Sequence, residues 1–241
     1  DTIGDMWECP DLFEVDGRYV LVMSPENIIA DDINYTNNSV YSIVDFDEET
    51  CEMKLINNQK FLDEGLDLYA PQTTLDEFGN RVLIGWMRMP LTFDGEDWIG
   101  MMSLPRVINI KNNDVYFSAP EYIDKLFNKE VKLSEFDVND VYKLNATLNK
   151  DSVLDIGGYK ISIVDDSIVT DRSKVFPDMK RKGRVFKSSK LNGRYDLSIY
   201  IDNGIIEIFI NDGKYVISNI VYGLESKIEV HNIETIRLLK I

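Results

Sequence analysis

The sequence predicts an all-β protein, and three observations support this prediction. Short runs rich in β-branched and aromatic residues alternate with polar turns through the first 118 residues. The second half shows a stricter alternation of apolar and polar residues, as in half-buried strands. Only residues 119–127 have a helical pattern, with Pro120 suited to a first helical turn. Short strands with polar turns are typical of a propeller, barrel or sandwich rather than a parallel α/β sheet.

The first half is expected to form successive antiparallel hairpins. Residues 12–15 and 18–24 are strand-like, and Asp16-Gly17 between them is a strong signal for a two-residue turn. An Asn-rich loop is expected over residues 26–38. The further strands expected in this half are 39–44, 51–55, 68–75, 82–87, 106–110 and 114–117.

The second half is expected to form antiparallel sheets packed face to face. In residues 195–201 the odd positions are apolar, and the return strand continues the buried stripe at Ile206, Ile208 and Ile210. Asn203-Gly204 between these strands is a turn signal. The other strands expected here are 153–156 and 159–164, joined by Gly157-Gly158, and 215–218. Two stacked sheets would bury these stripes.

Composition and charge narrow the function classes. The 241 residues are enough for one large or two medium domains. A formal charge of −16 argues against nucleic acid and anionic membranes as partners. No run approaches the ~20 apolar residues of a membrane span, and two cysteines are too few for a disulfide scaffold. With no signal peptide visible, a cytoplasmic protein is expected, with no metal and no cofactor.

The candidate catalytic residue is Glu8, in the run Trp-Glu-Cys-Pro-Asp at residues 7–11. Trp7 could wall off one side of this side chain and lower the local dielectric, which disfavours the charged carboxylate. Pro10 fixes its own φ and restricts Cys9 before it. A carboxyl group held neutral in this way is what a general acid needs. The alternative interpretation is a surface glutamate at the entry to a strand.

Several motifs in order resemble glycoside hydrolase family 32, which includes invertases, sucrose-6-phosphate hydrolases and fructanases. The resemblance begins with residues 7–11 and continues with residues 62–73 (Leu-Asp-Glu-Gly-Leu-Asp-Leu-Tyr-Ala-Pro-Gln-Thr). The later motifs are residues 84–87, 98–100 with 103–106, and 201–204 with 207–211. The family fold is a five-bladed β-propeller followed by a β-sandwich. The resemblance therefore implies a partial propeller over residues 1–120, a linker helix over 121–129 and a sandwich over 130–241.

The resemblance also implies roles for five residues. Glu8 would be the general acid/base, with Cys9 helping to tune its proton. Tyr69 and Trp86 match positions near the fructosyl pocket, and Asp67 is a further candidate for substrate binding. Tyr69, Trp86 and Asp67 also have structural interpretations, the two aromatic residues as the core of a propeller blade and Asp67 as a turn cap.

The sequence departs from the family pattern in one respect. The motifs that carry the family's nucleophilic aspartate and a second aspartate, Trp-Met-Asn-Asp-Pro-Asn-Gly and Arg-Asp-Pro, do not occur in residues 1–241. A retaining glycosidase needs two carboxyl groups about 5–5.5 Å apart. We therefore expect this chain to be the C-terminal portion of a β-fructofuranosidase, inactive on its own and prone to associate through unpaired propeller edges.

Other functions remain open at this stage. A non-catalytic carbohydrate-binding or interaction protein would retain half of such a site. A different five-bladed glycosidase, such as an arabinan-cleaving enzyme, would not carry the run at residues 7–11. The choice among sucrose, sucrose-6-phosphate and fructan is also open.

Overall fold

The computed structural model describes residues 4–30, 33–34, 37–179, 183–202 and 204–241. In these residues the regular structure is β-strand, apart from α1 (Glu121–Asp124) and one 3-10 turn (Leu133–Glu135). The prediction of an all-β fold is confirmed. The helical segment is shorter than the predicted stretch 119–127, because the chain leaves the helix and buries Phe127 against Tyr200, with ring centroids 5.5 Å apart.

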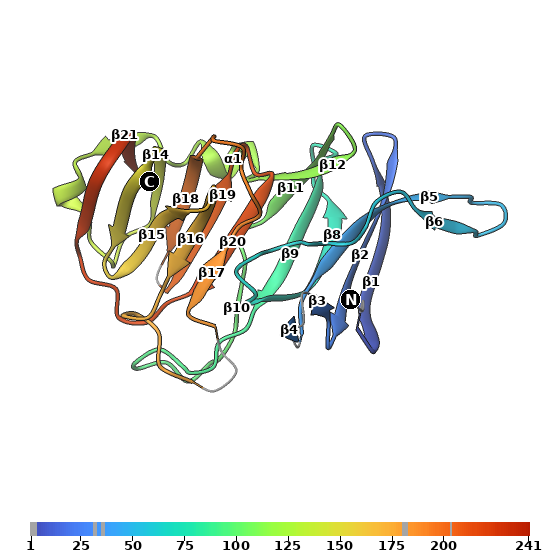
Figure 1. Ribbon diagram of the computed structural model, residues 1–241, viewed down its shortest axis with the longest axis horizontal. Coiled ribbons are helices and arrows are strands. Elements are labelled where there is room, and N and C mark those ends of the chain that lie inside the picture. Colours follow the sequence, from blue (N-terminus) through green and yellow to red (C-terminus); the bar gives the residue numbers. More distant parts are fainter. Residues whose placement is uncertain (1–3, 31–32, 35–36, 180–182, 203) are drawn as a thin grey trace.

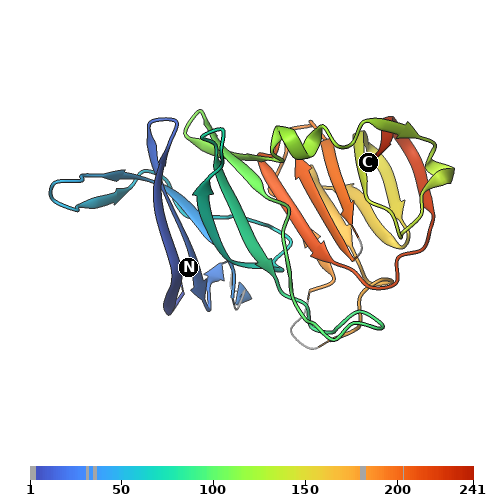
Figure 2. The same ribbon diagram turned by 180° about the vertical axis from the view of Figure 1, so that it is seen from behind.

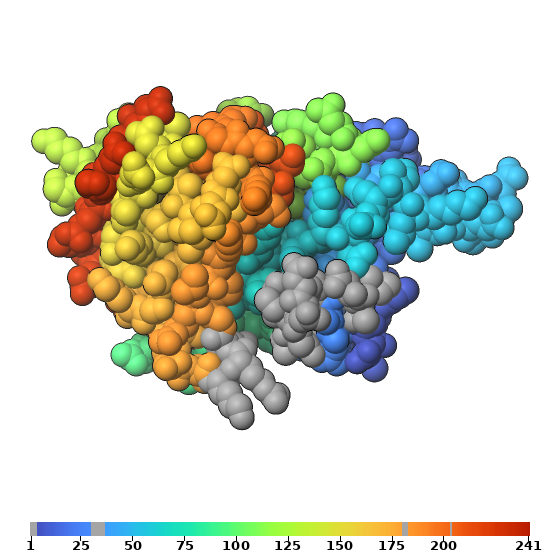
Figure 3. Space-filling view, viewed as in Figure 1, coloured from blue at the N-terminus to red at the C-terminus, as the bar shows by residue number. Residues whose placement is uncertain are grey.

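The first sheet contains β1 (Met6–Val15), β2 (Arg18–Glu26), β5 (Val40–Phe46) and β6 (Met53–Leu55) in that order, with β7 (Lys60–Phe61) also paired to β5. The predicted turn at Asp16-Gly17 is confirmed, since both residues have positive φ and Val15 pairs with Arg18. The sequence suggests that residues 7–11 precede a strand that begins at residue 12. In the structure these residues lie within β1. The β5–β6 hairpin projects from the rest of the molecule (Figures 1 and 3).

Within the predicted Asn-rich loop, β3 (Ile29–Ala30) and β4 (Ile33–Asn34) form a separate short pair. The remainder of that prediction lies partly outside the described residues.

The second sheet contains β8 (Leu68–Leu75), β9 (Arg81–Met87), β11 (Arg106–Lys111) and β12 (Asp114–Ser118), with the short β10 (Met101–Met102) also paired to β9. Two edge strands, β1 of the first sheet and β8 of the second, approach each other. Their facing sides share one core with residues of the C-terminal half: Val115 and Phe117 of β12 pack in the same cluster as Phe209 and Val216.

The third sheet is organised by β14 (Tyr142–Ile156). Its first half pairs with β18 (Asp196–Asp202), its second half with β15 (Tyr159–Val164), and β21 (Ile228–Lys240) follows most of its length. The remaining strands are β13 (Lys129–Val131), β16 (Ser167–Asp171), β17 (Val185–Lys187), β19 (Ile205–Ile210) and β20 (Tyr215–Ile220). Because the two ends of β14 serve different neighbours, the sheet folds over on itself. Ile161 of β15 and Ile208 of β19 therefore lie in one core.

The predicted Gly157-Gly158 turn is confirmed by positive φ at both glycines and by the pairing of Ile156 with Tyr159. At the other predicted turn, Asn203 lies outside the described residues, while its flanking residues Asp202 and Ile205 pair. The short helix α1 lies at the junction between β12 and the third sheet (Figure 2).

Candidate active site

Glu8 lies at a β-bulge in the edge strand β1. The register of the β1–β2 pair shifts between Glu8 and Asp11, and Cys9 at this bulge has a φ of 49°. A bulge bends the strand and re-aims its side chains, and bulges are common beside active sites. The Glu8 side chain accepts a hydrogen bond from the hydroxyl of Tyr69, with 2.6 Å between Tyr69 Oη and Glu8 Oε2.

Tyr69 is held in place by several contacts. It lies in β8 opposite Trp86, next to a second bulge at which Ala70 has positive φ. The Arg88 guanidinium stacks over its ring at 5.0 Å from the centroid, and the same Arg88 nitrogen, Nη2, donates to the carbonyls of Asn37 and Leu66 at 2.8 Å. Burial, and then the hydrogen bond to Glu8, raise the pKa of Tyr69 to about 12. Tyr69 therefore stays a neutral hydrogen-bond donor to Glu8 at neutral pH.

The two bulges are joined by side chains. Asp11 accepts hydrogen bonds from the Thr73 amide and hydroxyl at 2.8 and 2.7 Å. Gln72 Nε2 donates to the carbonyl oxygen of Cys9 at 3.3 Å. These bonds fix β1 against β8, although the two strands belong to different sheets. They hold the segment that carries Glu8 in register with the segment that carries Tyr69.

The two tryptophans of this region are both exposed. Trp7 is 56% exposed, so the expectation that it shields Glu8 from water is wrong. Adjacent strand residues point to opposite faces, and the ring that contacts the Glu8 carboxylate is Tyr69. Trp86 is 45% exposed, and its indole edge lies against Gly100. A Cβ at Gly100, where φ is +89°, would lie 2.4 Å from Trp86 Nε1. Glycine is therefore required there for the indole to keep its position.

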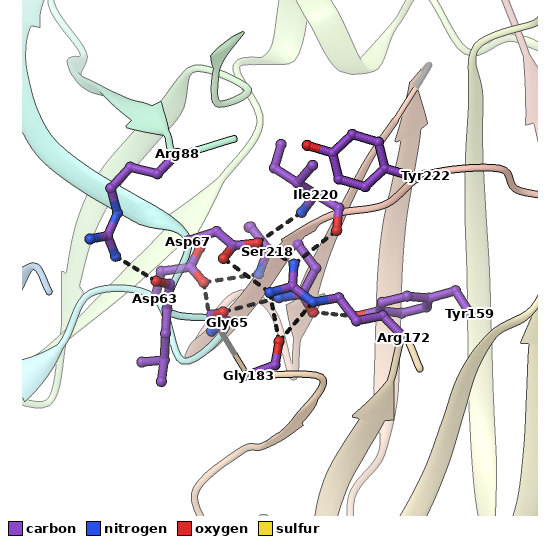
Figure 4. A network of polar contacts seen from close by, with 12 residues as sticks. Asp63, Gly65, Asp67, Arg88, Tyr159, Arg172, Gly183, Ser218, Ile220 and Tyr222 are labelled. Carbon is purple, nitrogen blue, oxygen red and sulfur yellow. Dashed lines mark hydrogen bonds and ion pairs between the residues drawn. The ribbon is translucent and has the colours of Figure 1, made fainter. Parts of the chain in front are cut away.

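Asp67 has a different environment. Its carboxylate is buried, pairs with Arg172 through both guanidinium terminal nitrogens, and accepts the Ile220 amide at 3.0 Å (Figure 4). Arg172 also donates to the carbonyls of Gly183 and Ile220. The structure therefore places the Asp67 carboxylate at the junction with the C-terminal half, where it is bonded to Arg172 and the Ile220 amide.

A second buried group of charges lies at the same junction. One terminal nitrogen of Arg106 contacts Asp63 at 2.8 Å and Glu207 at 2.7 Å, and all three side chains are buried. Burial raises the pKa of both carboxyls against the opposing attraction of Arg106. Neither arginine cluster, nor Arg88, is predicted by the sequence. The signal available was three acidic residues, Asp63, Glu64 and Asp67, interleaved with apolar ones in a single short run.

In the part of the chain that the structure describes, no helix is long and apolar enough to cross a membrane. No three Asp, Glu, His or Cys side chains among those residues lie together as potential metal ligands.

Residues 1–120 match the glycosyl hydrolases family 32 N-terminal domain, and residues 158–238 match the family 32 C-terminal domain. Sucrose-6-phosphate hydrolases of Vibrio alginolyticus and Bacillus subtilis are 32% and 30% identical, each over 90% of this chain. The matches cover 48% and 50% of those proteins. The chain thus spans about half the length of these relatives.

Solved structures show the same fold. A sucrose-6-phosphate hydrolase from Lactobacillus gasseri matches the whole chain with a TM-score of 0.84 at 23% identity, over 56% of its own length. A β-fructofuranosidase of Bombyx mori matches 98% of the chain with a TM-score of 0.79 at 22% identity, over 54% of its own length.

Proposed function

Because this chain belongs to glycoside hydrolase family 32, we propose that it is the C-terminal part of a retaining β-fructofuranosidase that acts on sucrose or sucrose-6-phosphate. The observation that carries the proposal is the contact between the Glu8 carboxylate and the Tyr69 hydroxyl at paired bulges of β1 and β8. We assign the first two sheets, within residues 1–120, to propeller blades, residues 121–129 to a linker and residues 130–241 to a β-sandwich. The positions of the two family matches and the folding-over of the third sheet support this division.

In the proposed mechanism Glu8 is the general acid/base. Its carboxyl protonates the glycosidic oxygen as the fructosyl bond breaks, and its carboxylate then removes a proton from the water that attacks the fructosyl intermediate. Tyr69 orients the carboxyl through its hydroxyl. We propose that the nucleophilic carboxylate is supplied from outside residues 1–241, so the chain alone is expected to be inactive on sucrose.

We propose that the exposed indole of Trp86 and the edge of Tyr69 face the sugar. For Asp67 we propose a positioning role, because its buried carboxylate is already bonded to Arg172 and to the Ile220 amide. By holding Asp67, Arg172 fixes the start of β8 and with it the placement of Tyr69.

The test is a Glu8→Gln variant of the enzyme completed by its N-terminal part. Loss of general acid–base assistance should lower kcat on sucrose by about 10²–10⁴-fold, and activated fructosides should lose less because their leaving groups need little protonation. Glu14→Gln, an exposed glutamate on the same strand, is the matched control and should leave kcat unchanged. A Glu8→Gln enzyme with wild-type kcat would remove Glu8 from the mechanism. A completed wild-type enzyme that binds sugar without cleaving it would favour the non-catalytic carbohydrate-binding alternative.

We also propose that residues 1–241 self-associate when produced alone. Large apolar side chains are exposed on the first two sheets, including Trp7, Leu12, Ile84, Trp86 and Met102. Apolar surface of this kind promotes association. Sedimentation of a stable monomer at high protein concentration would contradict this proposal.

A further inference from the structure

A groove lies between the β11–β12 hairpin, helix α1 and the outer face of strands β14 and β18. Its volume is about 770 Å³, within the range of pockets that bind small molecules. None of the described residues that line it belongs to the candidate active site, so the groove is a separate feature of the molecule.

Strand periodicity places the polar lining. In β14, Leu144 and Ala146 point into the core, whereas Lys143, Asn145 and Thr147 point into the groove. Across the β14–β18 pair these three residues are opposite Tyr200, Ser198 and Asp196, respectively. The groove wall is therefore a set of three cross-strand pairs on one face of the sheet.

The central pair of this wall is uncharged and leaves donors and acceptors free. The Ser198 hydroxyl lies 3.0 Å from Asn145 Oδ1 and donates to it. This bond fixes the orientation of the Asn145 amide, so its NH₂ group can donate to a ligand while the Ser198 oxygen can accept. Asn109 of β11 and Ser118 of β12 add an amide and a hydroxyl on the opposite side.

Each outer pair of the wall has one charged residue, which forms an ion pair with a residue outside the wall. Lys143 contacts Asp124, which also accepts a hydrogen bond from Tyr200 at 2.6 Å. At the other end Arg194 contacts Asp196 at 2.6 Å and Asp212 at 3.0 Å. The charged residues of the whole lining balance one another, with Lys111, Lys143, Arg194 and Arg237 against Glu121, Asp124, Asp196 and Asp212.

The balanced charges and the uncharged hydrogen-bonding groups of the groove favour a neutral, hydroxyl-rich ligand. An anion would meet the carboxylates and a cation would meet the basic groups, whereas a hydroxyl group can both donate and accept. The aromatic rings below the groove, Phe117, Tyr200 and Phe209, are less than 8% exposed, so an apolar ligand or an apolar peptide anchor has no exposed ring to contact. We propose that this groove binds a neutral oligosaccharide at a second site, separate from the one that contains Glu8.

The test is calorimetric titration of the chain, in a Glu8→Gln background, with the neutral tetrasaccharides nystose and maltotetraose and with inorganic phosphate. Saturable binding of at least one tetrasaccharide, and none of phosphate, is expected. Asn145→Leu should weaken that binding at least tenfold, because hydrogen bonds at the centre of the groove are lost. Ser198→Ala, which frees the Asn145 amide to rotate, should weaken it by a smaller factor.

The matched control is Asn58→Leu, at an exposed asparagine outside the groove. It should bind like the parent, and circular dichroism checks that each variant is folded. Trp86→Ala separates the two sites, since it should leave groove binding unchanged whether or not the proposed glycosidase activity is correct. The proposal is overturned if the folded chain binds neither tetrasaccharide, if phosphate binds instead, or if Trp86→Ala abolishes binding that Asn145→Leu and Ser198→Ala leave intact.

Discussion

Arg172→Met should destabilise the fold more than any exposed substitution in the chain. Arg172 is 1% exposed and Asp67 is 4% exposed. Removing the guanidinium leaves the Asp67 carboxylate buried with the Ile220 amide as its remaining partner in the described network. Breaking a buried pair by removing one partner costs about 3–5 kcal/mol. The free energy of unfolding of a domain is typically about 5–15 kcal/mol, so the loss should be a large fraction of it.

The assay is urea unfolding followed by tryptophan fluorescence and far-UV circular dichroism. The double variant Asp67→Leu/Arg172→Met removes both charges and should be less destabilised than the sum of the single variants, with a coupling of about 1–3 kcal/mol. The matched control is Arg237→Met. Its pair with Glu130 is 61% and 56% exposed, and the change should cost less than about 1 kcal/mol.

Two results would refute the reasoning. A fall of less than about 1 kcal/mol in the free energy of unfolding for Arg172→Met would show that the variant does not leave an unpaired buried charge at Asp67. Strict additivity in the double variant would show that the two charges do not stabilise each other in the folded protein.

Three further predictions follow from contacts described by the structure. Burial raises the pKa of Glu64 to about 7 against hydrogen bonds from Ser189. Between about pH 4.5 and 7 the folded protein keeps the Glu64 proton that the unfolded chain has released. The free energy of unfolding should therefore fall as pH rises from about 4.5 to 7 and then level off. Urea unfolding across this range should show a weaker pH dependence for Glu64→Gln, and an equally strong dependence would contradict the assignment. Gly213→Ala would place a Cβ 1.6 Å from the Phe117 carbonyl oxygen, at a φ of +78°. Gly17→Ala has a similar φ of +71°, but its Cβ would meet no atom within 4 Å. Thermal unfolding should show that the free energy of unfolding falls by about 1–2 kcal/mol for Gly17→Ala and by clearly more for Gly213→Ala, and equal losses would disprove the close approach. The proposed role of Glu8 as general acid/base predicts the effect of Tyr69→Phe in the completed protein. The variant loses the donor to the Glu8 carboxylate, so the alkaline limb of the pH–rate profile should move to higher pH, and an unmoved limb would mean that this bond does not act on the proposed catalytic proton.

The hairpins could be predicted from sequence because their turns are local. Asp16-Gly17 and Gly157-Gly158 place residues that tolerate positive φ between strand-like runs, and this chemistry needs no distant partner. The length of β14 could not be predicted in the same way. Its first half carries an ordinary alternation, but the way in which its ends pair with two different strands depends on residues far along the chain.

The candidate site was predictable to a similar extent. The run around Glu8 predicts a candidate carboxylate and a shielding role for Trp7, whereas the side chain that contacts this carboxylate is Tyr69, 61 residues away. The sequence predicts Asp67 as a candidate for substrate binding or as a turn cap. Its partner Arg172 lies 105 residues later, and no local pattern predicts this pairing. Local chemistry thus indicates which residues matter, while the partner of a buried charge is decided by packing.

The buried charges at the junction also determine when, during synthesis, the first half of the chain can finish folding. Asp63 and Asp67 leave the ribosome well before Glu207, Ser218 and Ile220, with which they or their arginine partners bond. Until these residues appear, both carboxylates must remain hydrated, and the apolar side of β12 has no Phe209 or Val216 to cover it. A nascent chain paused before residue 205 should therefore be open to proteases and chaperones in its first half. The first two sheets therefore complete their packing only after β19 and β20 have been synthesised.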